Sequence, residues 1–391
     1  MGPHVPGTPT VVLLSTSDTD LLSARASGAA FRLANPSRTP VDDLPALLAG
    51  ADVVVVRILG GSRTWPDGLA EMRASGLPVV ALGGEQAPDA EMMERSTVPA
   101  GVAAQAHTYL AQGGPANLAQ LHAFLSDTLL LTGHGFDPPI ELPAWGVLER
   151  DARPVDGPVV AVLYYRAQQL AGNTTYVEAL CSALEDAGAR PLPVYCASLR
   201  QAEPALLRTL AAADAMVVTV LAAGGTKPAS ASAGGDDEEW DVAELAALDV
   251  PILQGLCLTS SRDSWAENDD GLSPLDVATQ VAVPEFDGRL ITVPFSFKEF
   301  DADGLTVYVP DPERAARVAG IAVRHARLRH IPNADKRIVL MLSAYPTKHA
   351  RIGNAVGLDT PASAVALLQT MAAAGYDVGE LPGVAAGDGD A

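Results

Sequence analysis

The chain has 391 residues, of which 48% are hydrophobic, and this length predicts two or three domains with sizeable cores. Its 47 acidic residues outnumber its 26 basic residues, and a formal net charge of -21 argues against nucleic acid as the main partner, because phosphate binding needs concentrated positive charge. No apolar run approaches the roughly 18 residues that span a bilayer. Met1–Pro9 lacks the regions of a signal peptide, and the 3 cysteines form no Cys-x-x-Cys pair. We therefore expect a cytoplasmic protein without a membrane partner.

Short apolar strands alternate with helices over the first part of the chain. The mainly apolar run Val53–Ile58 is typical of a strand covered on both faces. Such alternation predicts a doubly wound parallel sheet. We expect strands at 10–14, 53–58 and 77–82, and helices at 17–28, 44–48, 66–74 and along the spaced leucines 118, 121, 125 and 129. The first α/β domain is predicted at 1–138, with a proline-rich linker at 139–156.

A second α/β series follows the linker. Thr175 and Glu178 have the spacing of a capping box, which predicts a helix start after a loop at 166–173. The small and acidic stretch 222–239 is expected to be a flexible insert. Strands are expected at 159–164, 192–195, 216–221 and 252–258, then extended pieces around a turn at 285–288, further strands at 290–297 and 305–309, and a helix at 311–330.

The second domain is predicted at 157–335, and 336–391 is expected to begin a further βα unit that is truncated. The fold class is α/β, with tandem doubly wound, flavodoxin- or Rossmann-like parallel-sheet domains. Ile338–Leu342 is expected to be a buried strand, and Thr360 the cap of a helix that carries Val365, Leu368 and Met371 on one face and ends at Gly375.

The polar turn between that strand and that helix is the best candidate anion-facing surface of the sequence. It clusters potentially basic groups beside an amide, namely Lys348, His349, Arg351 and Asn354. Loops after strands are where open α/β sheets bind ligands. An ordinary βα connection with a solvated basic loop explains the same residues.

The stretch YPTKHARIGNAVGLDTPAS, from Tyr345 to Ser363, resembles the large subunit of ATP-dependent cobaltochelatase, a family related to the tetrapyrrole-binding large subunit of magnesium chelatase. Three other stretches agree in order: STSDTDLLSARAS from Ser15, LAGNTTYVEAL from Leu170 and PEFDGRLITVPFSFKE from Pro284. The resemblance implies a subunit that binds the corrin hydrogenobyrinic acid a,c-diamide for Co²⁺ insertion in cobalamin biosynthesis, while separate motor-type ATPase subunits hydrolyse ATP.

Family members are much longer than this chain, which therefore resembles an amino-terminal portion. The resemblance places the residues that handle metal outside it, so no catalytic or metal residue is assigned and no cofactor is expected on this portion. Co²⁺ and ATP are used by the full complex. Two alternatives stay open: a magnesium chelatase large subunit acting on protoporphyrin, and a small-ligand-binding or scaffold module without a chelatase role.

Two groups of residues are candidates for substrate binding. Asn173, Thr174 and Thr175 stand at a helix start, where free N–H groups favour carboxylates. Plain helix capping is the alternative. The other group is Lys348, His349, Arg351 and Asn354, which suit the carboxylates and amides of a corrin periphery.

Other motifs are weaker. No close His/Glu pair has metal-ligand spacing, and His325 and His330 lie among arginines on what we interpret as a solvated basic helix face. Pro228 stands where a Walker A motif needs a hydroxyl residue, and no Gly-x-Gly-x-x-Gly fingerprint follows a strand.

Overall fold

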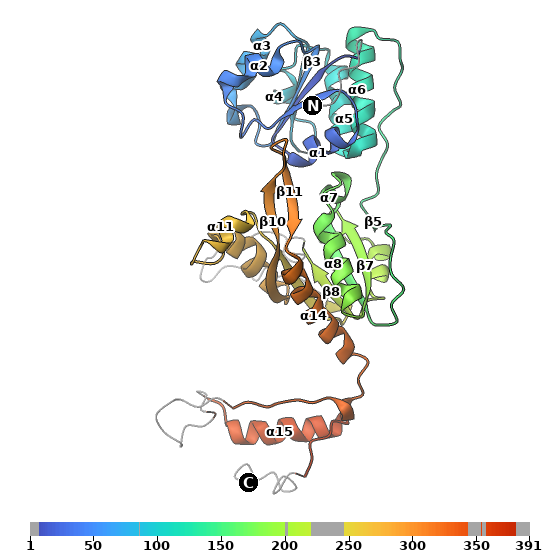
Figure 1. Cartoon of the computed structure of the whole chain (residues 1–391), viewed down its shortest axis with the longest axis vertical. Coiled ribbons are helices and arrows are strands. Elements are labelled where there is room, and N and C mark those ends of the chain that lie inside the picture. The colour runs from blue at the N-terminus through green and yellow to red at the C-terminus, as the bar shows by residue number, and fades with distance from the viewer. Residues whose placement is uncertain are drawn as a thin grey trace. The chain divides into compact units, whose positions relative to one another are not determined.

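The computed structural model describes residues 8–85, 87–199, 202–219, 246–342, 353 and 357–380 (Figure 1). The chain divides into two compact units, Met1–Ala322 and Val323–Ala391. The first unit contains two sheets, which confirms the predicted α/β class with tandem doubly wound domains. No described helix is long and apolar enough to cross a bilayer.

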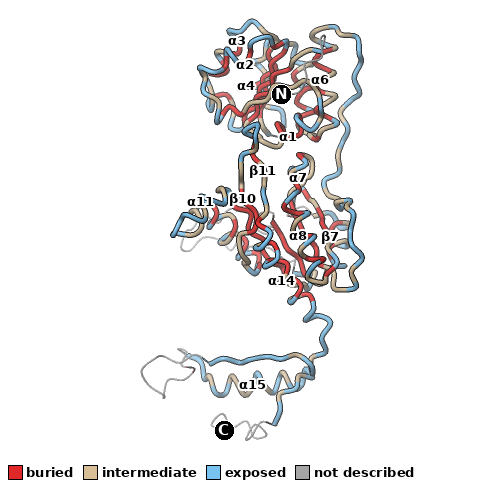
Figure 2. The backbone as a smooth tube through the Cα atoms, in the orientation of Figure 1, coloured by how far each residue is buried: buried red, intermediate tan, exposed pale blue. Residues whose placement is uncertain are grey.

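The first sheet has 4 parallel strands in the order β2-β1-β3-β4. Successive residues of β1 enter different cores: Val11 and Leu13 pack with one set of helices, and Val12 and Leu14 with another. Helices therefore cover both faces; β1, β3 and β4 are buried, and the edge strand β2 is half-buried (Figure 2). The elements are β1 Val11–Ser15, α1 Asp18–Ala26, β2 Phe31–Ala34, η1 Val41–Asp43, α2 Leu44–Leu48, β3 Val53–Ile58, η2 Ser62–Thr64, α3 Pro66–Ala74, β4 Val79–Gly83, α4 Ala90–Met93, α5 Ala100–Gln112 and α6 Gly114–Leu130.

The second sheet has 7 strands in the order β11-β10-β9-β8-β6-β7-β5. Its centre is parallel, and the two edge strands β5 and β11 are antiparallel to their neighbours. The elements are β5 Trp145–Val147, β6 Val159–Tyr165, α7 Arg166–Leu170, α8 Thr175–Asp186, β7 Arg190–Cys196, α9 Pro204–Leu210, β8 Ala215–Val218, β9 Ile252–Cys257, α11 Arg262–Ala266, α12 Pro274–Asp276, η3 Val277–Ala282, α13 Val283–Phe286, β10 Leu290–Phe300, β11 Thr306–Pro310 and α14 Pro312–Leu328.

Two predictions of secondary structure in this unit are wrong. The expected loop after β6 begins with the helix α7, whose Ala-Gln-Gln-Leu sequence consists of good helix formers. The expected extended piece before Gly288 is helical, because the Ser273 side chain accepts a hydrogen bond from the Asp276 N–H and Pro274 occupies the first turn. The insert 222–239 lies outside the described residues. The domain limits remain a prediction, and β5 lies within the expected linker.

The second unit contains the 3₁₀ turn η4 Asn333–Asp335 and the helix α15 Thr360–Ala373. The prediction of a buried strand at Ile338–Leu342 is wrong: the segment pairs with no described strand, and Val339 is 84% exposed. A strand is buried only where a neighbour takes its backbone hydrogen bonds and covers its side chains.

Helix α15 starts one residue away from the predicted cap. Asp359, not Thr360, accepts the capping hydrogen bond from the Ala362 N–H at 3.0 Å, and the Thr360 hydroxyl instead donates to the Gly353 carbonyl. Gly375 has φ +84° and ends the helix as predicted. Val365, Leu368 and Met371 are half-buried, whereas their neighbours Ala366 and Leu367 are exposed.

Candidate functional site

Both sheets have a topological switch point, which is where open α/β sheets bind ligands. In the first sheet β1 lies between β2 and β3, and in the second β6 lies between β7 and β8. The carboxyl ends of β1 and β3 carry Ser15 and Arg57, and β6 ends at Tyr165, directly before Arg166. Ligand contacts are therefore expected just beyond these residues.

One cleft of about 300 Å³ is lined from both switch points. Ser17, Asp20 and Arg57 contribute to it from the first sheet, and Tyr165 and Arg166 from the second. The charged residues of its lining are one carboxylate, Asp20, against two guanidinium groups. The cleft is thus formally positive in a chain whose net charge is -21.

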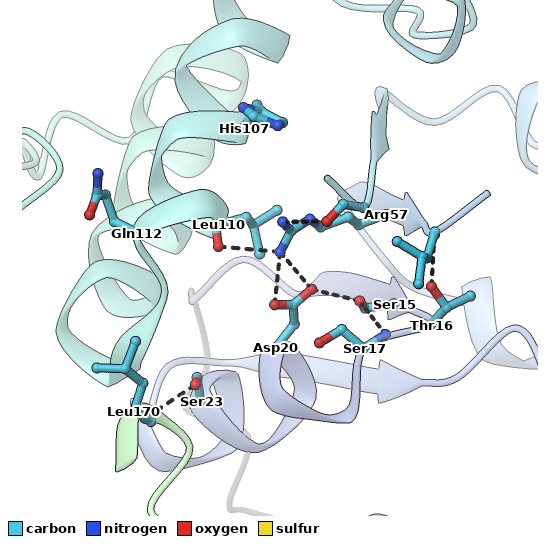
Figure 3. Close-up of polar contacts among 12 residues, drawn as sticks. Ser15, Thr16, Ser17, Asp20, Ser23, Arg57, His107, Leu110, Gln112 and Leu170 are labelled. Atoms are coloured by element: carbon cyan, nitrogen blue, oxygen red, sulfur yellow. Dashed lines mark hydrogen bonds and ion pairs between the residues drawn. The ribbon is translucent and has the colours of Figure 1, made fainter. Parts of the chain in front are cut away.

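Asp20 and Arg57 form a buried ion pair at the base of this cleft (Figure 3). Arg57 Nη1 donates to both carboxylate oxygens, at 2.9 and 3.1 Å, and the Ser15 hydroxyl donates to Asp20 Oδ2 at 2.7 Å. Burial raises the pKa of the Asp20 carboxyl, and the charge of Arg57 and the Ser15 hydrogen bond offset part of that rise.

The remaining donors of Arg57 reach backbone carbonyls. They contact Gly84 O at 2.9 Å, Leu110 O at 3.2 Å and Gly83 O at 3.3 Å. The guanidinium therefore connects the ends of β3 and β4 to the last turns of α5. With all these partners filled, Arg57 holds the walls of the cleft and has little capacity left for a ligand.

Arg166 differs from Arg57 because backbone carbonyls are its only partners in the described part of the chain. Its Nε donates to Pro143 O at 2.8 Å, and its Nη2 to Leu142 O at 3.1 Å and Gln112 O at 3.4 Å. No described carboxylate lies within ion-pair distance, and burial lowers the pKa of the half-buried guanidinium. The full positive charge of Arg166 therefore interacts only with the partial negative charges of carbonyl oxygens.

The first group of predicted site residues has structural contacts. The Asn173 side-chain oxygen accepts a hydrogen bond from the Tyr308 N–H at 2.9 Å and so connects the start of α8 to β11. The buried Thr174 donates its hydroxyl to Glu178 Oε1 at 3.0 Å, and Thr175 is exposed. Thr174, not Thr175, is the N-cap of α8, and its side chain makes no capping hydrogen bond, so the predicted capping box does not form.

None of Asn173, Thr174 and Thr175 lines the 300 Å³ cleft, and their role in substrate binding remains a prediction. The second predicted group, Lys348, His349, Arg351 and Asn354, lies outside the described residues.

Sequence reasoning missed Asp20, Arg57 and Arg166. One signal could have found Arg57: it is the single charged residue in the run VVVVRI, one position from the end of a buried strand. A charge at such a position requires a partner, and Asp20 follows the neighbouring strand.

Two histidines and the three cysteines of the first unit are buried. His107 Nε2 contacts Glu85 O at 3.1 Å, His122 Nε2 contacts Pro9 O at 3.0 Å, and burial lowers the pKa of both rings. All three cysteines are buried and free. The described residues contain no group of three or more His, Cys, Asp or Glu side chains that could hold a metal.

Two doubly wound sheets, with residues beside both switch points lining one cleft, define a tandem α/β unit of the Rossmann or flavodoxin type. Residues 107–388 match the family model described as CobN/Magnesium Chelatase, and the chain belongs to this family.

Known members are similar over nearly the whole chain. The solved catalytic subunit of cobaltochelatase from Mycobacterium tuberculosis is 69% identical, with a TM-score of 0.80, over 98% of this chain and 32% of that one. The aerobic cobaltochelatase subunit CobN of Pseudomonas aeruginosa is 34% identical over 97% of this chain and 32% of the relative. The corresponding Sinorhizobium protein is 32% identical over the same shares. The chain thus spans about a third of the length of these relatives.

Proposed function

We propose that this chain is the part of a cobaltochelatase large subunit that helps to bind the tetrapyrrole into which Co²⁺ is inserted during cobalamin biosynthesis. The observation that carries the proposal is the similarity of nearly the whole chain to the solved catalytic subunit of cobaltochelatase. The substrate is hydrogenobyrinic acid a,c-diamide, whose free carboxylates suit a positive cleft in an otherwise acidic chain.

The division of labour follows from what metal insertion requires. The macrocycle must be held, Co²⁺ must be delivered by ligands such as imidazole, and a base must accept the pyrrole protons. The described residues offer a cleft and no cluster of metal ligands, so their contribution is to bind and orient the substrate. Separate motor-type subunits hydrolyse ATP, and the predicted loops at Asn173–Thr175 and Lys348–Asn354 contact the macrocycle periphery.

The test is a titration of the cobalt-free corrin against this chain, followed by visible absorbance. Saturable spectral change is expected, and a silent titration would favour a scaffold module without a chelatase role. In a second assay, motor subunits, ATP and Co²⁺ are added to this chain or to a full-length large subunit. Only the full-length protein is expected to give metallated corrin, and turnover by this chain would contradict a purely binding role.

A magnesium chelatase role is the second candidate, because the matching family description names both enzymes. Protoporphyrin and the corrin, titrated side by side, separate the two candidates. Tighter binding of the corrin is expected, and a preference for protoporphyrin would reverse the assignment.

A further inference from the structure

Arg166 lines the cleft between the two switch points, and no described carboxylate neutralises the charge of its guanidinium group. Asp20 is already neutralised by Arg57 at 2.9 Å. Arg166 makes its hydrogen bonds through Nε and Nη2, and its Nη1 has no partner in the described part of the chain. A half-buried guanidinium with a free donor is suited to bind an anion, because charge-assisted hydrogen bonds are about twice as strong as neutral ones.

Hydroxyl groups from α1 complete the polar lining. Ser17 and Thr19 both line the cleft, and neither hydroxyl has a hydrogen-bond partner among the described residues. Ser17 precedes α1 as its N-cap but makes no capping bond with its side chain. Its hydroxyl is therefore available to a ligand, as is that of Thr19.

We propose that this cleft binds a carboxylate group, with Arg166 as the cationic partner and the Ser17 and Thr19 hydroxyls as further donors. A cleft of about 300 Å³ is at the lower limit for small-molecule sites and accommodates an acidic side arm, not a whole macrocycle. This inference rests on the proposed function, in which the carboxylate is one of the peripheral groups of the tetrapyrrole. A free short dicarboxylate offers the same chemistry.

Ser17 offers a matched pair of variants for the test. Asn and Asp are both as good as Ser at an N-cap, so Ser17→Asn and Ser17→Asp should fold equally well. Only Ser17→Asp adds a negative charge to the cleft. We expect Ser17→Asp to weaken carboxylate binding by roughly 10- to 100-fold, the loss typical of a hydrogen bond to a charged group, and Ser17→Asn to change it little.

A second pair of variants tests the cation. Arg166→Gln removes the charge, and Arg317→Gln removes an arginine that is 62% exposed and pairs with Glu313 on the surface of α14. Because Arg166 also holds the backbone at Leu142 and Pro143, its thermal unfolding is measured in parallel. Binding should weaken in Arg166→Gln and not in Arg317→Gln.

The probes are succinate, measured by calorimetry, and two cobalt-free corrins, one with free carboxylates and one with all carboxylates esterified, both followed by absorbance. Binding of the free-acid corrin that weakens in Ser17→Asp, together with poor binding of the ester, would identify a macrocycle arm as the ligand. Binding of succinate alone, with the same Ser17→Asp sensitivity, would keep the cleft assignment and contradict the tetrapyrrole role. Equal corrin binding by wild type, Ser17→Asp and Arg166→Gln would overturn the assignment and leave the proposed function standing. Failure of every probe to bind would overturn both.

Discussion

Arg57 and Asp20 meet at 2.9 Å beneath the cleft, with both side chains only 6% exposed. Through this pair, the end of β3 is joined to the first turns of α1, and the carbonyl contacts of Arg57 add β4 and α5. The relationship fixes the positions of Ser17 and Thr19, which lie on the same turns as Asp20. The shape of the proposed binding cleft therefore depends on a buried charge pair that does not itself need to touch a ligand.

Breaking this pair from one side should be costly. Asp20→Ala leaves the Arg57 charge buried without a carboxylate, and we expect a loss of about 3–5 kcal/mol in the free energy of unfolding. The double variant Asp20→Leu with Arg57→Met removes both charges and should recover much of the loss. Urea denaturation of the wild type, of Asp20→Leu, of Arg57→Met and of the double variant measures the coupling between the two side chains. Additive effects of the two substitutions would contradict it.

Glu185 should make the stability of the fold depend on pH, and the direction of its pKa shift determines the direction of that dependence. Its side chain is 2% exposed; it accepts hydrogen bonds from Arg150 and, at 3.1 Å, from Arg153, and the Arg150 bond lowers its pKa below the ordinary value of 4.5. A carboxyl with a lowered folded-state pKa adds stability above pH 4.5, and that stability is lost as the pH falls through the folded-state pKa.

The variant Glu185→Gln should therefore lose about 1–3 kcal/mol at pH 7, where hydrogen bonds to the charged group contribute in full. Its stability should also change less than that of the wild type between pH 5 and pH 3, a window of roughly one to two units around the ordinary Glu pKa. Urea midpoints at both pH values measure the difference. Parallel pH profiles for the two proteins would show that Glu185 does not contribute this dependence.

His122 should make the first unit sensitive to mild acid. The ring packs edge-on against Phe31, with centroids 5.2 Å apart, and burial lowers its pKa below the ordinary value of 6.5. A base with a lowered folded-state pKa is protonated more easily when unfolded, so stability falls as the pH drops below about 6.5. We expect the thermal midpoint to fall between pH 7.5 and 5.5, and the fall to be smaller in His122→Phe. If the thermal midpoint of His122→Phe falls with pH as much as that of the wild type, another group causes the effect, and His107 is the next candidate.

Much of the fold could be predicted because its strands are covered on both faces. The run Val53–Ile58 is buried as its composition predicts, and the glycine at position 375 ends its helix as expected. The capping prediction failed because a capping signal depends on only a few neighbouring residues. Capping signals at Thr174 and Thr175 differ by one residue, and only the packing of α8 decides which of the two hydroxyls is buried.

The cleft could not be predicted because it depends on the meeting of two sheets. Asp20 and Arg57 are 37 residues apart, and Arg166 is in helix α7, which follows a strand of the second sheet. Periodicity predicts which side chains are buried, but it does not predict which switch points share one cleft. The rule that open α/β sheets bind ligands at the loops after their strands applies to many segments of this chain. The loop with the most basic residues, around Arg351, lies outside the described residues.

The apolar segment Ile338–Leu342 provides the last test, because its composition and its environment disagree. Val339 and Met341 are each 84% exposed, so Val339→Ser and Met341→Ser should change the free energy of unfolding by no more than about 0.5 kcal/mol. Leu13→Ala, at a site with 0% exposure in the first core, is the control and should cost about 2–5 kcal/mol. Calorimetry of the three variants measures the contrast. A loss of several kcal/mol in Val339→Ser would mean that the segment is covered in solution after all, as expected for a buried strand.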